Sequence, residues 1–98
     1  MSDKVYKINE GFILRSIVGA NGEEKFVVIT VGEAYKKLNA MITLNATCVF
    51  IWKMLEKGAT KNEIVLSLSK EYAVDETVVA DDVDEVLKGF INIGVIND

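Results

Sequence analysis

The first forty-odd residues alternate between short apolar runs and turn signals, a pattern that is typical of β-strands. Phe12–Val18 is apolar and rich in β-branched residues, and Lys25–Val31 repeats that character after the segment Gly19–Gly22. Asn21-Gly22 within that segment is the strongest short signal for a hairpin turn. Tyr35–Ile42 follows, and its period-two alternation predicts a third strand. A three-stranded antiparallel sheet is therefore expected.

From Leu44 onward apolar residues recur at every third or fourth position, which predicts three helices in succession. Residues that commonly cap helices bound all three segments: Thr43 or Asn45 and Gly58 for the first, the capping box Thr60–Glu63 for the second, and Asp75 and Gly94 for the third. The predicted inward faces are Leu44, Cys48, Ile51, Trp52 and Leu55 on the first helix, and Ile64, Val65, Leu68 and Tyr72 on the second. Phe50 and Leu66 fall outside these faces, either as ordinary exposed apolar residues or as parts of an interface.

The third helix carries more apolar residues than one contact needs. At 100° per residue they cover an arc of about 160°, whereas a single core contact requires roughly 100°. The arc comprises Val79, Ala80, Val83, Val86, Leu87, Phe90, Ile91 and Ile93. The surplus predicts a second apolar contact on one flank, with another helix, a dimer partner or a bound peptide.

The order of elements predicts one α+β domain over residues 1–98, winged-helix-like, with a three-stranded antiparallel sheet followed by three helices. Half of the residues are hydrophobic, so a packed core is expected, and the net charge of −4 argues against nucleic acid as a partner. No apolar run is long enough to span a membrane. The single cysteine cannot form an internal disulfide, which fits the cytoplasm.

The sequence lacks a set of acid, base and nucleophile residues from which a catalytic site could be assembled. The chain has no histidine and one cysteine, so histidine chemistry and thiolate metal sites within one chain are excluded, and no metal or cofactor is expected. The acidic cluster Asp81–Glu85 is interpreted as a solvated helix face. Cys48 is interpreted as a structural thiol, and Arg15 is expected to reach water or to pair with a carboxylate. A binding module, not an enzyme, is the default interpretation.

Several short motifs occur in an order and spacing that resemble the PqqD-like proteins from about Tyr6 to Ile96. At the front these are Tyr6-Lys7-Ile8 and Gly11–Arg15; in the middle Met41–Asn45, Thr47 and Ile51-Trp52; later Leu55–Gly58, Thr60, Glu63-Ile64, Tyr72, Val74-Asp75, Asp82-Val83 and Gly94–Ile96. One departure is Ala46, where a glutamate is common in the family. That position is predicted to face outward, so the fold should not depend on it.

The resemblance implies a non-catalytic recognition domain that binds the leader segment of a ribosomal precursor peptide. It would present this peptide to a modifying enzyme, expected to be a radical-SAM enzyme. In the family the leader adds as a strand to the third strand and lies against the third helix. Carried over to this sequence, the surface is Lys36, Lys37, Leu38, Asn39, Ala40 and Met41 on the strand, with Val83, Leu87, Phe90 and Ile91 on the helix. An exposed sheet edge that accepts a peptide agrees with this picture.

Two other classes compete with this hypothesis. A winged-helix transcription factor would need a basic recognition helix, but the third helix has only Lys88 against at least five acidic residues. A structural or regulatory interaction module, such as a homodimer built on the spare apolar flank, would bind no peptide. Concentration-dependent mass without peptide affinity would distinguish that module.

Overall fold

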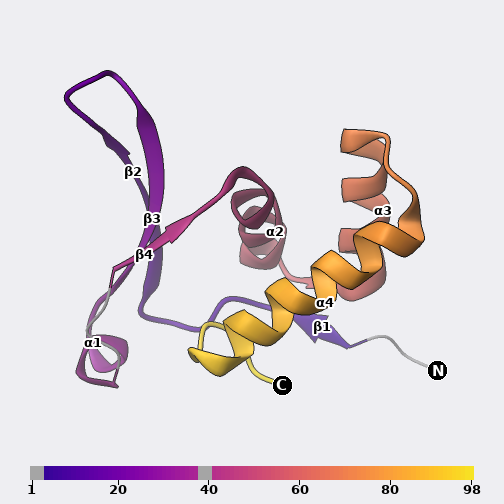
Figure 1. The fold of residues 1–98 in the computed structure, drawn as a ribbon. Helices are drawn as coiled ribbons and strands as arrows, with labels where there is room; N and C mark the ends of the chain where they lie inside the picture. Colours follow the sequence, from indigo (N-terminus) through magenta and orange to yellow (C-terminus); the bar gives the residue numbers. More distant parts are fainter. Residues whose placement is uncertain (1–3, 38–40) are drawn as a thin grey trace.

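The protein has a small antiparallel sheet at one end and three long helices at the other (Figure 1). The computed structural model describes residues 4–37 and 41–98. In chain order the elements are β1 (Val5–Tyr6), β2 (Phe12–Val18), β3 (Glu24–Thr30), α1 (Glu33–Lys37), β4 (Ile42–Leu44), α2 (Ala46–Lys57), β5 (Ala59–Thr60), α3 (Lys61–Tyr72) and α4 (Glu76–Asn92). This arrangement confirms the predicted α+β class and is compatible with a winged-helix-like description.

The hairpin of β2 and β3 forms as the sequence predicted. The strands pair in antiparallel register from Phe12 opposite Thr30 to Val18 opposite Glu24. The turn between them is closed by the Gly22 N–H, which donates to the Gly19 carbonyl at 3.0 Å. Gly22 has φ +80°, a left-handed conformation that glycine adopts without steric cost, so the Asn-Gly signal was read correctly.

The prediction of a strand over Tyr35–Ile42 was wrong at its start and is met only at Ile42, where β4 (Ile42–Leu44) begins. Residues Glu33–Lys37 form the helix α1, and the third strand of the sheet is β4, which pairs with Phe26–Val28 of β3. Lys36 and Lys37 therefore lie on a helix, whereas Leu38, Asn39 and Ala40 fall outside the described residues. Acidic Glu33 in the first turn and the lysines in the last turn favour a helix through its macrodipole. Lysine, glutamate and alanine are also poor strand formers, which period-two alternation alone does not register.

Side-chain caps begin the long helices α2 and α3 where the sequence predicted them. The Asn45 side chain accepts a hydrogen bond from the Cys48 backbone N–H at 2.9 Å, so Asn45 rather than Thr43 caps α2. Thr60 and Glu63 form the predicted capping box: the Glu63 N–H donates to the Thr60 hydroxyl at 3.1 Å, and the Thr60 N–H donates to the Glu63 carboxylate at 2.9 Å. These bonds satisfy backbone donors that would otherwise lack partners.

The cap of α4 is Asp75, also as predicted. Its carboxylate accepts hydrogen bonds from the Thr77 backbone N–H, at 2.8 Å, and from the Thr77 hydroxyl. Hydrogen bonds to the charged form stabilise it, so those from the Thr77 side chain and backbone lower the pKa of Asp75.

The core lies between the helices and one face of the sheet, with Trp52 at its centre. Trp52, Ile51 and Leu55 of α2 have no exposed surface, and the Trp52 ring meets Phe90 of α4 edge to face, with ring centroids 5.7 Å apart. The sheet contributes the side chains that alternate inward: Phe12, Leu14, Phe26, Val28, Ile42 and Leu44. The indole N–H of Trp52 is buried without a hydrogen-bond partner among the described residues.

The inward faces of α2 and α3 match the prediction in most positions. Two differ: Cys48 is half-buried, and Tyr72 is about half exposed, at 48%, because it lies in the last turn of α3, beyond the core. Val49 is buried although it was not assigned to the inward face. Apolar periodicity identifies the middle of a buried helical face better than its edges.

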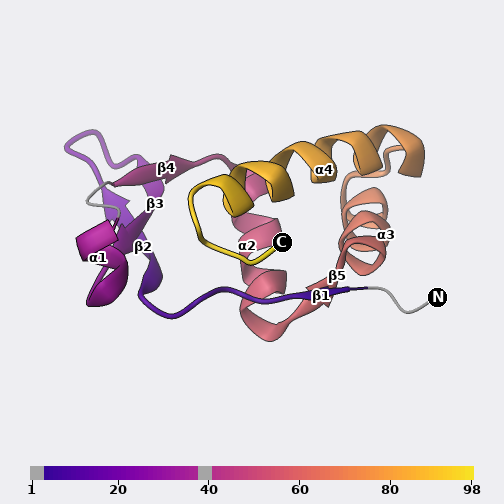
Figure 2. The same ribbon diagram turned by 90° about the horizontal axis from the view of Figure 1, so that it is seen from below.

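The two ends of the chain are bound into the helical part. β1 pairs with β5 in antiparallel register, with Val5 opposite Thr60. The Asn9 N–H donates to the Val95 carbonyl at 2.8 Å, and the Asn9 side-chain amide donates to the Gly94 carbonyl at 2.9 Å. Val95 and Ile96 are fully buried, so the C-terminal tail belongs to the core. Figure 2 shows β1 beside β5 and the segment after β1 crossing the end of α2 on its way to the sheet.

Candidate functional site

The strand β4 has a free edge. The sheet order is β2-β3-β4, so β3 covers one side of β4, and none of the residues in the described ranges pairs with its other side. Thr43 in the strand is exposed, and so is Met41 immediately before it, at 65%. Backbone N–H and C=O groups along such an edge can pair with an added strand.

A hollow of about 390 Å³ lies between α1 and the end of α4. Its apolar lining comes from Phe12 at the start of β2, Ala34 of α1 and Ile93 after α4. Lys37 of α1 contributes a cation to the same hollow, and Glu10 and Glu33 contribute two carboxylates. The apolar part of this lining suits apolar side chains of a peptide, whereas the mixed charges favour neither acidic nor basic ones.

The close approach of α1 to the sheet depends on Gly11. This residue has φ +91°, and a Cβ added to it would lie 2.7 Å from the Cβ of Ala34 and 2.8 Å from the Val31 carbonyl oxygen. The Val31 N–H also donates to the Gly11 carbonyl at 2.8 Å. No side chain fits there without moving α1, so Gly11 positions one wall of the hollow.

The predicted strand residues are thus distributed differently from the prediction. Lys37 lines the hollow, whereas Lys36 forms an exposed ion pair with Glu33 at 3.3 Å. Met41 lies beside the free edge, before β4 begins. The structure therefore brings Lys37 and the end of α4 to one hollow, although Lys37 reaches it from a helix and not from a strand.

Of the four residues predicted on the third helix, three lie in the core. Val83, Leu87 and Phe90 are buried, and only Ile91 is partly exposed. The wide apolar arc has an intramolecular explanation, because α4 packs both on α2, through Phe90 and Trp52, and on α3. Spacing along one helix cannot tell a second helix of the same chain from an external partner.

The two flanks of α4 face different neighbours. Ala80, Asp84 and Ile91 share one flank, where the Asp84 carboxylate pairs with Lys61 at the start of α3 at 2.7 Å. Val86 and Ile93, which are spaced i and i+7, share the other flank, and Ile93 lines the hollow beside α1. The flank of Val86 and Ile93 is thus the one that faces α1. The sequence alone did not determine which flank this would be.

Reactive groups do not converge in this region. In residues 4–37 and 41–98 no group of three or more cysteine, histidine or acidic side chains could hold a metal ion. Burial raises the pKa of the Cys48 thiol, outweighing a hydrogen bond from the Asn45 backbone segment, so the nucleophilic thiolate is disfavoured. Within the described part of the chain, no helix combines the length and apolar character that crossing a membrane requires.

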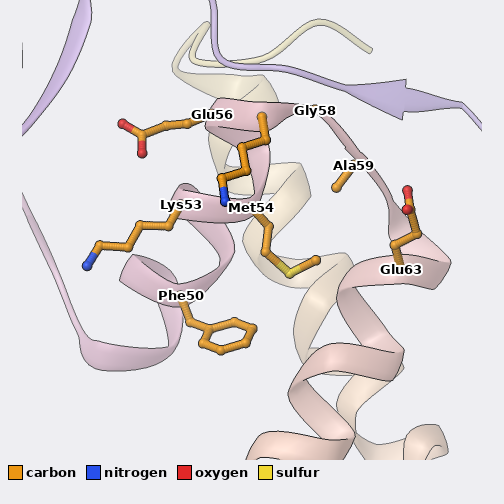
Figure 3. Close-up of a pocket in the computed structure, with 8 residues that line it drawn as sticks. Phe50, Lys53, Met54, Glu56, Gly58, Ala59 and Glu63 are labelled. Atoms are coloured by element: carbon orange, nitrogen blue, oxygen red, sulfur yellow. The ribbon is translucent and has the colours of Figure 1, made fainter.

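A second hollow, of about 550 Å³, lies between α2 and the beginning of α3. Phe50 and Met54 point from α2 towards α3 in Figure 3, whereas Lys53 and Glu56 point away. Phe50 is half-buried and meets Tyr72 edge to face, with ring centroids 6.3 Å apart. Phe50 is therefore neither an ordinary exposed residue nor a core residue. Lysines and glutamates both line this hollow, so its charge favours no class of partner.

Comparison with known proteins gives a consistent result. The family model described as "Coenzyme PQQ synthesis protein D (PqqD)" matches residues 23–96. A solved structure described as "TbiB1 in Complex with the TbiA(beta) Leader Peptide" superposes with a TM-score of 0.73 at 24% sequence identity, covering 93% of this chain and 94% of that one. This likeness shows a shared fold. No curated protein matches the chain significantly.

Proposed function

The chain belongs to the PqqD family, and from that premise we propose that it binds the leader segment of a ribosomal precursor peptide and presents it to a peptide-modifying enzyme. We further propose that the enzyme is of the radical-SAM class and that the encounter takes place in the cytoplasm. TbiB1, which has the same fold, was solved with a leader peptide. The observation that carries the proposal is the free edge of β4.

In this proposal the leader adds to the sheet as a fourth strand next to β4. Hydrogen bonds to the outer backbone groups of Ile42–Leu44 would set the register of the peptide. β4 is only three residues long, so these bonds alone would hold the peptide weakly. Side-chain contacts beyond the strand must supply the rest of the affinity.

Those contacts would come from α4 and α1. The half-buried side chains of Val86 and Ile93 offer apolar surface, and Lys37 offers a cation in the hollow that Ile93 lines. Apolar leader residues would pack on the first two, and a leader residue with a hydrogen-bond acceptor would meet Lys37. Val83, Leu87 and Phe90 would support this surface from within the core and would not touch the peptide.

The chain would promote the reaction by tethering. A leader held on this domain keeps the attached core peptide near the enzyme, which raises its effective concentration at the active site. This role needs no catalytic group on the chain itself. The alternative, an interaction module that forms homodimers without binding peptide, predicts that molecular mass rises with protein concentration and that leader has no effect.

An NMR titration tests the proposal. The ¹⁵N-labelled chain is titrated with the leader half of a short peptide encoded beside its gene. We expect shifts at Lys37, Met41–Leu44, Val86 and Ile93, with a Kd of about 1 μM or lower. Shifts confined to the α2–α3 hollow would contradict the proposed site, and an absence of shifts at high peptide excess would favour the interaction module.

A matched pair of variants makes the test specific for one flank of α4. Ile93→Ser and Ile91→Ser each remove a half-buried isoleucine, so their effects on stability should be similar. Only Ile93→Ser should weaken leader binding, by about tenfold, because it removes apolar contact area on the flank that faces α1. Equal losses for the two variants would place the peptide elsewhere.

A further inference from the structure

One face of the sheet turns away from all three long helices (Figures 1 and 2). Because side chains alternate along strands, this face carries every second residue of β2 and β3, opposite to those that enter the core. We define the bare sheet face by Ile13, Arg15 and Ile17 of β2 and by Lys25 and Ile29 of β3. Val27 lies among them on the same side of the sheet but is buried, with 4% of its surface exposed. None of these residues belongs to the core that the long helices build.

The bare sheet face carries large apolar side chains. Antiparallel sheets with one open face ordinarily place polar residues on it. Here Ile13 lies directly opposite Ile29 in the register and both are half-buried, whereas Ile17 is 43% exposed. Large apolar side chains that remain partly open in one chain are typical of a site for a macromolecular partner.

The charge of this face is opposite to that of the whole chain. The chain has a net charge of −4, yet Arg15 and Lys25 are the charged residues of the bare sheet face, and neither forms an ion pair with any described residue. Both side chains are exposed. Glu24, the nearest acid in sequence, alternates to the other face and accepts a hydrogen bond from the Ser16 hydroxyl at 2.6 Å. Apolar side chains between unpaired cations complement an apolar protein surface that carries carboxylates.

We propose that the bare sheet face is the docking surface for the peptide-modifying enzyme, through an apolar patch of that enzyme bordered by aspartate or glutamate. This inference rests on the proposed function, because it assigns the partner that the leader-binding role requires. It also separates the two partners in space: the leader takes the edge of β4, and the enzyme takes the face of β2 and β3.

β4 lies between the two surfaces: its exposed Thr43 is on the same side of the sheet as the bare sheet face and is opposite the buried Val27 in the register. A leader strand added beside β4 would project every second side chain onto that same face. The enzyme would then contact the sheet and the leader together. It follows that the enzyme binds the leader-loaded chain more tightly than the free chain, so that unloaded chains compete poorly for it.

Titration calorimetry with two charge-matched double variants tests the proposal. The enzyme encoded beside the gene of this chain is titrated with the wild type, with Arg15→Glu/Lys25→Glu and with Lys53→Glu/Lys57→Glu, each with and without the leader. Both doubles change the net charge equally, but only the first alters the bare sheet face. We expect it to weaken enzyme binding by about tenfold or more and the second to change it by less than about twofold.

Leader affinity, measured in parallel for each variant, should stay at the wild-type value, so a failure of the proposed function would appear there and not in the enzyme titration. An unchanged enzyme affinity for Arg15→Glu/Lys25→Glu would overturn the docking assignment, and so would a wild type that binds the leader but not the enzyme. Analytical ultracentrifugation tests whether a second copy of the chain binds this face instead. A wild-type dimer that Arg15→Glu/Lys25→Glu dissociates would assign this face to a second copy of the chain and contradict the proposal.

Discussion

The helical part and the sheet of this protein differ in how much of their hydrogen-bonding and apolar surface is used within the chain. In the helical part the caps, the capping box and the ion pair of Lys61 with Asp84 all find partners within the chain, and Trp52, Ile64 and Val83 are fully buried. The sheet has a free edge at β4 and an apolar face with unpaired cations. The difference shows where unused surface remains: most of the surface of the long helices is used in packing within the chain, whereas the sheet keeps a backbone edge without a partner among the described residues.

The largest expected effect comes from placing a charge in the helical part. Leu87→Asp buries a carboxylate among apolar side chains, because Leu87 is 4% exposed in the core. The loss should exceed about 4 kcal/mol, which is a large part of the stability of a small domain. Urea unfolding followed by circular dichroism should show little cooperative transition. Ile17→Asp on the bare sheet face is the matched change and should cost no more than about 1 kcal/mol. Similar losses in the two variants would erase the contrast between the regions.

Replacing glycine by alanine should change the stability in opposite directions at Gly11, next to the sheet, and at Gly89, in α4. Gly11→Ala forces a side chain against Ala34 and Val31 at a positive φ and should destabilise the protein by about 1–3 kcal/mol while displacing α1. Gly89→Ala lies within α4 with no heavy atom near its added Cβ, so it should stabilise the protein by about 0.5–1 kcal/mol. Thermal unfolding of both variants measures the two signs, and a stabilising Gly11→Ala would show that α1 is not held by this contact.

Removing one helix cap should have a smaller effect. Asn45→Ala leaves the Cys48 N–H without its side-chain acceptor at the junction of β4 and α2 and should cost about 1 kcal/mol. Because the junction positions the edge strand, hydrogen exchange in Ile42–Leu44 should accelerate more than in α3. Uniform acceleration throughout the chain would mean that the cap contributes to global stability alone.

The smallest effect is a dependence of stability on acid pH through Asp75. Its pKa is lowered in the folded chain by hydrogen bonds from Thr77, so the folded state favours the carboxylate. This contribution is complete above the pKa of an unfolded aspartate, about 4, and is lost as the pH falls through the lower pKa of the folded state. Asp75→Asn keeps a capping oxygen but cannot ionise, so its melting temperature should fall less steeply than that of the wild type below about pH 4. Parallel curves would assign the acid sensitivity to other carboxylates.

Sequence reasoning succeeded where a feature depends on neighbouring residues. The Asn21-Gly22 turn, the Thr60–Glu63 capping box and the Asp75 cap are local, and each occurs as predicted. It failed at the start of the predicted strand Tyr35–Ile42, where alternation indicated a strand although helical propensity and charge order favour the helix Glu33–Lys37.

The site was harder to predict than the fold, because burial depends on contacts between distant segments. Nothing in the spacing of Val83, Leu87 and Phe90 says that α2 and α3 of the same chain occupy the wide apolar arc. The pairing of β1 with β5, and of Asn9 with Val95, joins residues far apart in sequence that have no local signal. The resemblance to the PqqD family suggested which elements to consider, and the structure shows that Ile93, at the end of α4, lines the hollow beside α1.

The position of Trp52 makes it an intrinsic fluorescent probe of the core. It is the single tryptophan, it has no exposed surface, and it packs on Phe90 within the helical part. The Trp52 emission spectrum should therefore change when the core unfolds. Conformational changes or binding confined to the sheet should leave this spectrum nearly unchanged. Its indole proton, buried without an acceptor among the described residues, should give a lone and slowly exchanging NMR resonance. Trp52 fluorescence thus reports unfolding of the helical part separately from changes confined to the sheet, without an attached dye.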